Sequence, residues 1–355
     1  MAHILILAGG TGGHVYPALA VARALEGRGW EVTWMGAPDS FEARVVPQAG
    51  FELVTIDAHR LRGQGAAELA KAPFRLARAV WQAGRRLRAV RPDLVLGMGG
   101  FVAAPGGLAA RLAGVPLVIH EQNAVPGLTN RLLARLATRV LQAFPDSFPE
   151  SVGAVTTGNP LRAELLAVAP PAERMAGRGK ARRILVLGGS LGAQALNEVV
   201  PEALARLNRE LQIRHQAGRG KAGQAAAGYR RCGLEAEVTE YIDDMAEAYA
   251  WADLAICRAG AITVSELAAV GLGAVLVPYP HAVDDHQSAN ARHLEQVGAA
   301  LVLPQASLTP EVLAQLLRPQ LAERYTLREM AEAARRAGRP DATEAVADQC
   351  EAVVA

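Results

Sequence analysis

The sequence is poor in cysteine, in aromatic residues and in long apolar runs. Its three cysteines, Cys232, Cys257 and Cys350, are widely separated and form no C-x-x-C pair, so no disulfide framework is expected. The apolar run at residues 4–8 ends at Gly9, whereas a membrane-spanning helix needs about 20 apolar residues. No signal peptide is recognisable at the start. These absences predict a protein of a reducing, cytosolic setting with no segment that crosses a bilayer.

The composition, with 51% hydrophobic and 20% charged residues, is that of a globular chain and argues against disorder. At 355 residues the chain exceeds one ordinary core, so two domains are expected. The net charge is only +2, but no acid lies between Glu68 and Asp93, a stretch that contains Lys71, Arg75, Arg78, Arg85, Arg86, Arg88 and Arg91. This basic stretch needs an explanation of its own.

Short apolar segments alternate with helical patterns along the chain. Buried parallel strands are expected at residues 3–8, 31–36, 94–97 and 117–120, and a helix at about 17–27. After a Pro/Gly/Arg-rich stretch at 170–182 the pattern restarts, with strands at 183–187, 254–257 and 274–278 and a last helical segment from about 327. We therefore expect an α/β protein with two Rossmann-like, doubly wound domains, at residues 1–165 and 166–335. A C-terminal helix at 336–355 can pack back on the N-terminal domain.

Three glycine-rich loops follow predicted strands, at residues 9–13, 97–100 and 188–192. Glycines after a strand turn backbone N–H groups outward, and the next helix start adds partial positive charge, so phosphate is a natural ligand. None of the loops has the full G-x-G-x-x-G spacing, and no acid ends the second strand, which argues against a dehydrogenase. The alternative for each loop is close packing of helix and strand without a ligand.

Two polar segments of the first half are candidate sites. His14 follows the first glycine loop at a helix start, where a neutral imidazole can accept a proton; capping the helix or binding a phosphate is the alternative role. Residues 120–123, His-Glu-Gln-Asn, end a predicted strand at the edge where open α/β sheets bind ligands. A loop that only caps the strand with side-chain hydrogen bonds is the alternative.

Two segments of the second half carry similar signals. Residues 258–267 place backbone amides, two hydroxyls and the Glu266 carboxylate at a helix start, a set suited to uracil, ribose and phosphate. Complementing the helix dipole is the alternative role for Glu266. Residues 284–287, Asp-Asp-His-Gln, are adjacent on a loop with no second cluster of carboxylate and histidine, so no metal is assigned.

Taken together, these motifs resemble the MurG family of N-acetylglucosaminyltransferases over essentially the whole chain. The resemblance rests on residues 9–14, 97–100, 120–123, 127–130, 158–162, 188–190 and 258–266. It implies a GT-B fold, with the two domains facing across a cleft, an N-terminal acceptor-binding domain and a C-terminal UDP-GlcNAc-binding domain. It also implies inverting transfer of GlcNAc to the 4-hydroxyl of the muramoyl sugar of lipid I, giving lipid II in peptidoglycan synthesis, without a metal or other cofactor.

The resemblance also implies site residues. His14 matches the histidine proposed to act near the reacting centre, and Glu121 is a second candidate base. The substrate-binding positions that match are Thr11, Gly12, Gly13, Asn123, Arg162, Ser190, Ile242, Ala261, Ile262, Thr263, Val264, Ser265, Glu266 and Gln287. Gly99 and Gly100 match the loop for the acceptor diphosphate. Phe101 and Leu191 depart from the family, where Tyr and Gln are frequent, so no side-chain contact from these positions is expected.

The basic stretch acquires a role from this resemblance. We expect Phe74, Leu76, Val80 and Trp81 to enter a membrane interface while basic side chains meet anionic headgroups, in a patch that comprises Lys71, Phe74, Arg75, Arg78, Trp81 and Arg85. This predicts peripheral association with the cytoplasmic face of the inner membrane, near cell-wall synthesis proteins. An ordinary solvated helix face is the alternative. Nucleic acid is not expected as a partner, because no aromatic platform accompanies the charge.

Two other functions use the same fold. A non-hydrolysing UDP-GlcNAc 2-epimerase also needs glycine loops and a carboxylate for the ribose, but it needs no lipid-facing patch. A non-catalytic nucleotide-sugar sensor would bind UDP-GlcNAc and release no UDP with any acceptor. The presence of both His14 and the acceptor-side segment 120–123 argues against a sensor.

Overall fold

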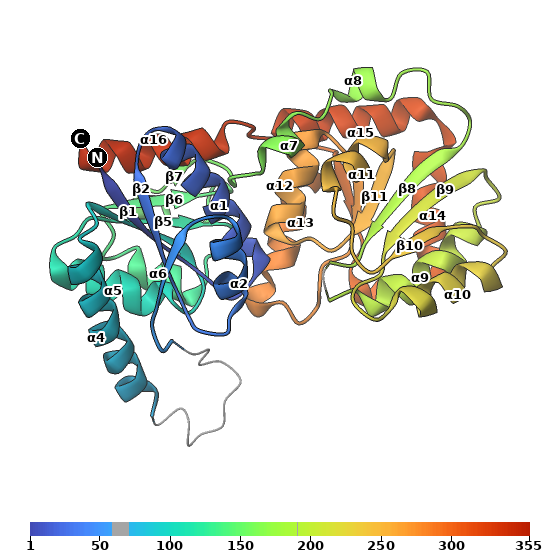
Figure 1. The fold of residues 1–355 in the computed structure, drawn as a ribbon. Coiled ribbons are helices and arrows are strands. Elements are labelled where there is room, and N and C mark those ends of the chain that lie inside the picture. Colours follow the sequence, from blue (N-terminus) through green and yellow to red (C-terminus); the bar gives the residue numbers. More distant parts are fainter. Residues whose placement is uncertain (59–70, 190) are drawn as a thin grey trace. The chain divides into compact units, whose positions relative to one another are not determined.

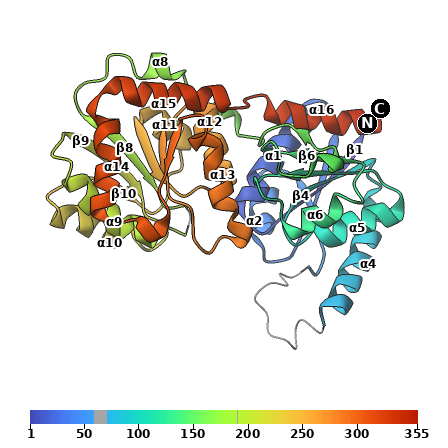
Figure 2. The ribbon, with the colours of Figure 1, turned by 180° about the vertical axis from the view of Figure 1, so that it is seen from behind.

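The computed structural model describes residues 1–58, 71–189 and 191–355 (Figure 1). By its internal contacts the chain divides into two compact units. Unit 1 comprises Met1–Arg162 together with Pro340–Ala355, and unit 2 comprises Ala163–Arg339. Each unit contains one sheet, with helices on both of its faces (Figure 2).

The sheet of unit 1 is parallel throughout, with the strand order β3-β2-β1-β4-β5-β6-β7. The chain therefore starts in the middle of the sheet, extends to one edge and crosses back to build the other, which is the doubly wound arrangement. The strands are β1 (His3–Ala8), β2 (Glu31–Gly36), β3 (Glu52–Thr55), β4 (Leu94–Gly99), β5 (Leu117–Glu121), β6 (Arg139–Gln142) and β7 (Val155–Thr156).

The two faces of this sheet bury alternate residues of its strands. Ile4 and Ile6 lie in a core on one face, and Leu5 and Leu7 in a core on the other. A strand buried on both faces has no polar alternation, which is why β1 reads as one apolar run. The helices of the unit are α1 (Gly12–Gly27), α2 (Phe41–Gln48), α4 (Ala72–Val90), α5 (Ala103–Ala113), α6 (Leu128–Leu133) and α16 (Ala342–Val354), with a short 3₁₀ turn at Glu150–Val152.

The first helix begins earlier than the expected position near Pro17. Thr11 is extended, and its carbonyl already accepts the Val15 N–H at 3.2 Å, so Gly12 and Gly13 form the first turn of α1. The first N–H groups of a helix need no partner within it, so the glycines can start the helix directly after the loop. The consequence for the site is that His14 lies inside the first turn and not ahead of it.

The end of the chain forms two helices that belong to different units. α15 (Arg324–Ala337) belongs to unit 2, and α16 belongs to unit 1, where it packs on α1. Gly338 and Pro340 lie between them and interrupt the helical pattern. Val346, Ala347 and Cys350 of α16 join the core beside α1, and Arg28 at the end of α1 pairs with Glu344, Asp348 and Glu351.

The sheet of unit 2 repeats the same topology, with the strand order β10-β9-β8-β11-β12-β13, again parallel. Its strands are β8 (Arg182–Leu187), β9 (Leu211–Gln216), β10 (Glu237–Thr239), β11 (Leu254–Cys257), β12 (Ala274–Leu276) and β13 (Ala300–Val302). β12 ends before the expected Pro278, which lacks the N–H that would continue the ladder. The prediction of doubly wound α/β sheets is confirmed.

The remaining helices of unit 2 cover this sheet. They are α7 (Ala163–Leu166), α8 (Pro171–Arg174), α9 (Gln194–Ala205), α10 (Ala222–Arg231), α11 (Met245–Trp251), α12 (Ala261–Val270), α13 (His286–Glu295) and α14 (Pro310–Ala322), with 3₁₀ turns at Val283–Asp285 and Gln305–Ser307. Buried residues of β8, α9, α14 and α15 form one continuous core. The carboxyl ends of the parallel strands in each unit carry the segments that the sequence marks as sites.

Candidate functional site

The first glycine loop joins β1 to α1 and does not turn every amide outward. The Gly10 N–H is donated inward to Oε2 of Glu42 at 2.9 Å, and the Glu42 side chain is fully buried. The expectation of outward amides is therefore wrong for Gly10. Thr11, Gly12 and Gly13 follow it at the start of α1, where the first N–H groups of a helix point out along its axis and can bind an anion. Sequence reasoning missed Glu42, because nothing local links residue 42 to the loop at 9–13.

His14 lies against the second glycine loop. A Cβ added to Gly99 would lie 2.7 Å from Cδ2 of His14, so the imidazole edge rests where any other residue would place a side chain. Gly99 and Gly100 have φ of +101° and +87°, a conformation that glycine adopts without strain. The Gly9 N–H is donated to the Gly99 carbonyl at 3.4 Å. The structure thus brings the first and second loops of unit 1 together, with His14 between them.

The segment after β5 is a buried hydrogen-bond network. Nε2 of His120 lies 2.9 Å from the Gly158 carbonyl, which only accepts, so Nε2 carries the proton and donates it. Nδ1 then accepts a hydrogen bond from the Gln122 side-chain amide at 3.2 Å. The same amide group also donates to the Met98 carbonyl at 2.9 Å. Burial lowers the pKa of His120 to about 4, so the imidazole is neutral at pH 7.

Glu121 faces this network and not open solvent. Its Oε1 accepts the backbone and side-chain N–H groups of Asn123 at 2.9 and 3.1 Å. Its Oε2 accepts from the Gly127 N–H at 3.1 Å and from the Asn130 side chain at 2.9 Å. A carboxylate has about four acceptor positions, and four donors occupy them. Glu121 therefore holds the loop at 122–130 in place and orients the Asn123 side chain.

Arg162 is positioned over the first helix. Its guanidinium carbon lies 5.9 Å from the centroid of the Tyr16 ring, which packs edge-on against Phe41 at 5.9 Å. Asn159, just upstream, donates to the Gln122 carbonyl at 3.0 Å. The segment 158–162 therefore lies between the loop at 120–123 and α1, and it brings Arg162 to the edge of unit 1 that holds His14.

The third glycine loop follows β8 in unit 2, and its conformation also requires glycine. Gly192 has φ of +72°, and a Cβ there would lie 2.0 Å from the Ala217 carbonyl oxygen. Leu191 is exposed, and its carbonyl accepts from the Lys221 ammonium at 2.8 Å. Lys221 brings a positive charge that the sequence did not single out. Ser190, expected to bind substrate, lies outside the described residues.

The helix α12 presents the substrate-binding run at its start. Ala261 and Val264 are buried, so their side chains pack inward, while Ile262, Thr263, Ser265 and Glu266 are partly exposed. Glu266 lies beyond the first turn of α12, so it does not serve the helix dipole, and that alternative is wrong. Its Oε2 instead accepts from the Tyr249 hydroxyl at 2.9 Å.

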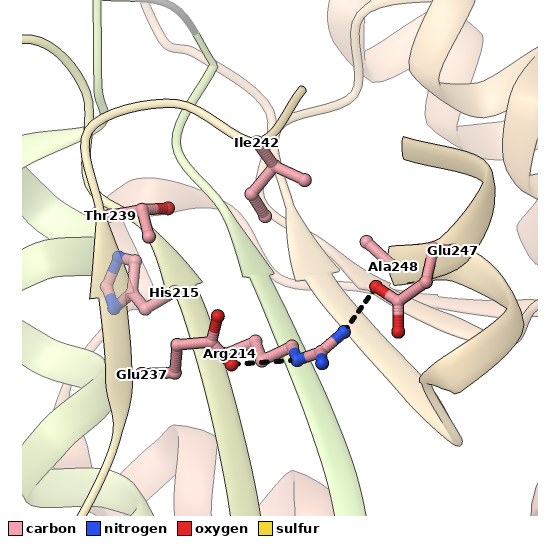
Figure 3. A pocket seen from close by; sticks show the side chains of 7 residues that line it. All are labelled: Arg214, His215, Glu237, Thr239, Ile242, Glu247 and Ala248. Carbon is pink, nitrogen blue, oxygen red and sulfur yellow. Dashed lines mark hydrogen bonds and ion pairs between the residues drawn. The ribbon is translucent and has the colours of Figure 1, made fainter. Parts of the chain in front are cut away.

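A small pocket lies at the ends of β9 and β10 in unit 2 (Figure 3). Figure 3 shows Arg214 bridging two acids across it, with 3.0 Å to Glu237 and 2.6 Å to Glu247. Ile242 is the one predicted site residue that lines it, with Arg214, His215, Glu237, Thr239, Glu247 and Ala248. The pocket combines one apolar wall with a charged wall, and the sequence pointed only to Ile242.

Gln287 lies in the first turn of α13, where its Oε1 accepts the Tyr279 N–H at 2.9 Å. It thereby ties the loop at 279–285 to the helix. Asp284 and Asp285 in this loop have positive φ, of 55° and 50°. Across residues 1–58, 71–189 and 191–355, no cluster of three His, Cys, Asp or Glu side chains with the arrangement of a metal site is found.

The basic stretch forms α4, whose apolar side chains divide between two faces. Ala79, Ala83 and Leu87 are buried against the sheet, and Val80 packs on the same core, so the expectation that Val80 enters a membrane is wrong. Phe74 and Trp81 are 80% and 60% exposed, and Arg85 stacks over Trp81 at 5.1 Å. Arg78 pairs with Asp57 at 2.7 Å. In the part of the chain that the structure describes, no helix is both long and apolar enough to span a bilayer.

Comparison with known proteins shows the family of the chain. Residues 4–142 match the glycosyltransferase family 28 N-terminal domain, and residues 183–346 match the family 28 C-terminal domain. A UDP-N-acetylglucosamine--N-acetylmuramyl-(pentapeptide) pyrophosphoryl-undecaprenol N-acetylglucosamine transferase from Methylococcus capsulatus is 56% identical over 98% of this chain and 97% of its own length. The protein of the same name from Marinobacter nauticus is 53% identical over 98% of this chain and 96% of its own length.

Solved structures agree. The crystal structure of Acinetobacter baumannii MurG is 43% identical, covers 99% of this chain and 100% of its own, and has a TM-score of 0.86. A Listeria monocytogenes protein described as a UDP-N-acetylglucosamine 2-epimerase covers 96% of this chain and 94% of its own, with a TM-score of 0.67 and 17% identity, which shows a shared fold alone. The two-domain GT-B fold is thereby confirmed, and the chain belongs to the MurG family of glycosyltransferases.

Proposed function

We propose that the protein transfers GlcNAc from UDP-GlcNAc to the 4-hydroxyl of the muramoyl sugar of lipid I, and so forms lipid II with a β-1,4 bond. The observation that carries the proposal is that both halves of the chain match the two domains of one glycosyltransferase family, with relatives of this activity above 50% identity along almost the whole length. The product is a peptidoglycan precursor, which connects the protein to cell shape and cell division.

The two units divide the substrates in this proposal. Residues 1–165 bind the acceptor, 166–335 bind the donor, and the helix at 336–355 supports the acceptor unit. The acceptor diphosphate meets the backbone amides at Gly99 and Gly100, where positive φ values turn the chain at the end of β4. Because Phe101 has no hydroxyl to donate, the backbone amides are the donors in this loop.

The donor lies along the strand ends of unit 2. Glu266 accepts the ribose hydroxyls, and its hydrogen bond from Tyr249 supports this role by restraining the carboxylate. Ile242 contacts the uracil, Ala261 to Ser265 line the nucleotide, and Gln287 contacts the sugar. The loop at 188–192, which includes Ser190, and the cations of Lys221 and Arg162 meet the diphosphate.

The chemical step is a displacement with inversion. The acceptor O4 forms a bond to the anomeric carbon as the bond from that carbon to the UDP oxygen breaks, and the O4 proton passes to His14. Negative charge grows on the departing diphosphate, and glycine-loop amides, Thr11, Gly12, Gly13 and Arg162 stabilise it without a metal ion. His14 is the base in this scheme. Glu121 is a positioning residue for Asn123, because its acceptor positions are already occupied.

The surface of α4 brings the enzyme to its lipid substrate. The patch comprises Lys71, Phe74, Arg75, Arg78, Trp81 and Arg85, and its aromatic side chains are exposed rather than packed. Basic residues beside exposed aromatics favour an anionic lipid surface. The protein is thus a peripheral protein of the cytoplasmic face of the inner membrane, where other cell-wall synthesis proteins act.

The test measures UDP release from UDP-GlcNAc with and without a short-chain lipid I analogue, each with and without EDTA. Release that depends on the analogue and is unaffected by EDTA is expected. Formation of the manno epimer from UDP-GlcNAc alone would favour a 2-epimerase. Donor binding without UDP release under any of these conditions would favour a sensor, and loss of release in EDTA would remove the metal-independent mechanism.

A further inference from the structure

A buried carboxylate lies behind the first glycine loop and has no part in the reaction described so far. Glu42 belongs to the first turn of α2 and is 0% exposed. Its Oε2 accepts the Gly10 N–H at 2.9 Å, and its Oε1 accepts the Ala37 N–H at 3.2 Å. The start of a helix carries partial positive charge, so α2 stabilises the carboxylate in this position.

The side chain of Glu42 fills a slot that glycines leave open. A Cβ on Gly9 would lie 2.6 Å from Oε1 of Glu42, and a Cβ on Gly36 would lie 2.7 Å from its Cγ. Gly9 follows β1 and Gly36 ends β2, so Glu42 is packed between the ends of two neighbouring strands. A side chain enclosed in this way has little freedom, and it holds the backbone at Gly9 and Gly10 in one conformation.

The other side of the same loop is in contact with the second glycine loop. A Cβ on Gly100 would lie 2.2 Å from the Gly9 carbonyl oxygen, and Gly99 in turn supports the edge of the His14 ring. Gly9 is thus enclosed between Glu42 on one side and residues 99–100 on the other. A shift of the loop at Gly9 and Gly10 therefore moves the residues that locate His14.

We infer that Glu42 is a positioning residue for the transfer reaction: it fixes the loop at 9–13 from behind and so sets the place of His14. The inference rests on the proposed function, in which His14 takes the acceptor proton. Glu42 touches no substrate and acts through the Gly10 N–H. The same bond directs that N–H away from any substrate phosphate.

The substitution E42Q tests this role with little change of shape. Both oxygens of Glu42 face backbone donors, so the amide of Gln must direct its own NH₂ group against one of them and lose that hydrogen bond. We expect kcat to fall by about tenfold or more, with the KM for UDP-GlcNAc changed by no more than about twofold, because the residues assigned to the uracil and the ribose belong to unit 2.

The matched control is S40A in the same helix. Ser40 Oγ accepts the Ala43 N–H at 3.2 Å and caps α2, so its removal weakens the helix but leaves the bond from Gly10 to Glu42. S40A should lower the Tm and leave kcat unchanged. If S40A lowers kcat as far as E42Q does for an equal loss of Tm, Glu42 has only a structural role and the inference is overturned.

A double substitution separates action through His14 from a general effect. In an H14A background E42Q should lower kcat by less than about twofold, because there is no longer a base to misplace. A full tenfold effect in that background overturns the inference, as does a wild-type kcat for E42Q alone.

If circular dichroism shows that E42Q is unfolded, E42D replaces it. This substitution keeps the charge but withdraws the carboxylate from Gly10, and the same outcomes apply. A wild-type chain that releases no UDP with the analogue refutes the proposed function, whereas an active wild type with a fully active E42Q refutes this inference alone.

Discussion

The hydroxyl of Tyr249, a side chain that is only 1% exposed, donates a 2.9 Å hydrogen bond to Oε2 of Glu266. Tyr249 belongs to α11 and Glu266 to α12, so the bond joins two successive helices on either side of β11 in the chain. A buried donor restrains the partly exposed carboxylate, which is the group proposed to accept the ribose hydroxyls. In the proposed function, recognition of the donor therefore depends on a residue that need not touch it.

Two substitutions separate these contributions to donor binding. E266A should raise the KM for UDP-GlcNAc by about tenfold or more, since hydrogen bonds to a charged group contribute about 1.5–3 kcal/mol. Y249F removes one hydroxyl and should raise the same KM by roughly fivefold, for about 1 kcal/mol, with kcat near wild type. Steady-state kinetics at saturating lipid I analogue measures both. An unchanged KM for E266A would remove the ribose assignment.

The contact between His14 and Gly99 leads to a prediction on kcat. G99A introduces a Cβ at 2.7 Å from His14 Cδ2 and should displace the imidazole, and H14A should lower kcat by about 10²-fold if His14 is the base. The control is G114A, where φ is +73° but no atom lies within 4 Å of the added Cβ, so it adds backbone strain alone. Turnover of G99A equal to that of G114A would show that the contact is not functional.

The exposed surface of α4 leads to a prediction on membrane binding. F74A/W81A should weaken sedimentation with anionic vesicles, because two exposed aromatic side chains leave the interface. Neutralising Arg78, Arg85 and Arg86 should also weaken it and reduce its dependence on salt. Y325A, which removes an exposed aromatic residue of unit 2, is the control and should sediment like the wild type. A partition that is insensitive to salt and to all these changes would exclude the patch.

Two buried histidines lead to a prediction on stability against pH. Burial lowers the pKa of His120 and of His215 from 6.5 to about 4. The unfolded chain therefore binds more protons than the folded chain between these values, so this contribution to stability is complete above pH 6.5 and is lost as the pH falls toward 4. At pH 4 each site lowers the free energy of unfolding by up to about 3 kcal/mol relative to neutral pH.

Thermal denaturation between pH 7 and pH 4 checks the prediction. The Tm of the wild type should fall across this range, and the fall should be shallower in H215Q, which has no imidazole to protonate at that position. His215 lies between Tyr229 and Asn197, whose atoms are 2.9 and 3.0 Å from its ring nitrogens, so H215Q also lowers the Tm at pH 7. The slope with pH, and not the absolute Tm, is the diagnostic quantity. Equal slopes would contradict the assignment.

Much of the fold could be predicted, because its signals are local. The apolar run of β1 and the glycines that follow it are adjacent in the sequence, and the same pattern restarts near residue 183. Strands of a parallel sheet are buried on both faces, so they appear in the sequence as such short apolar runs. The predicted bounds of β2 and β11 agree with the structure. A less local feature was missed, because α1 begins five residues before Pro17.

The sequence by itself determined which residue types are present for the chemistry: His14, Glu266, the glycine loops and the exposed aromatic residues of α4. Only the tertiary structure decided their partners. Glu42 reaches Gly10 because β1 and β2 are neighbours in the sheet, and Gly99 meets His14 because β4 lies on the other side of β1. Glu121, which reads as a base in the sequence, is occupied by four donors. Strand order and register bring distant residues within hydrogen-bond reach, and no local pattern encodes those distances.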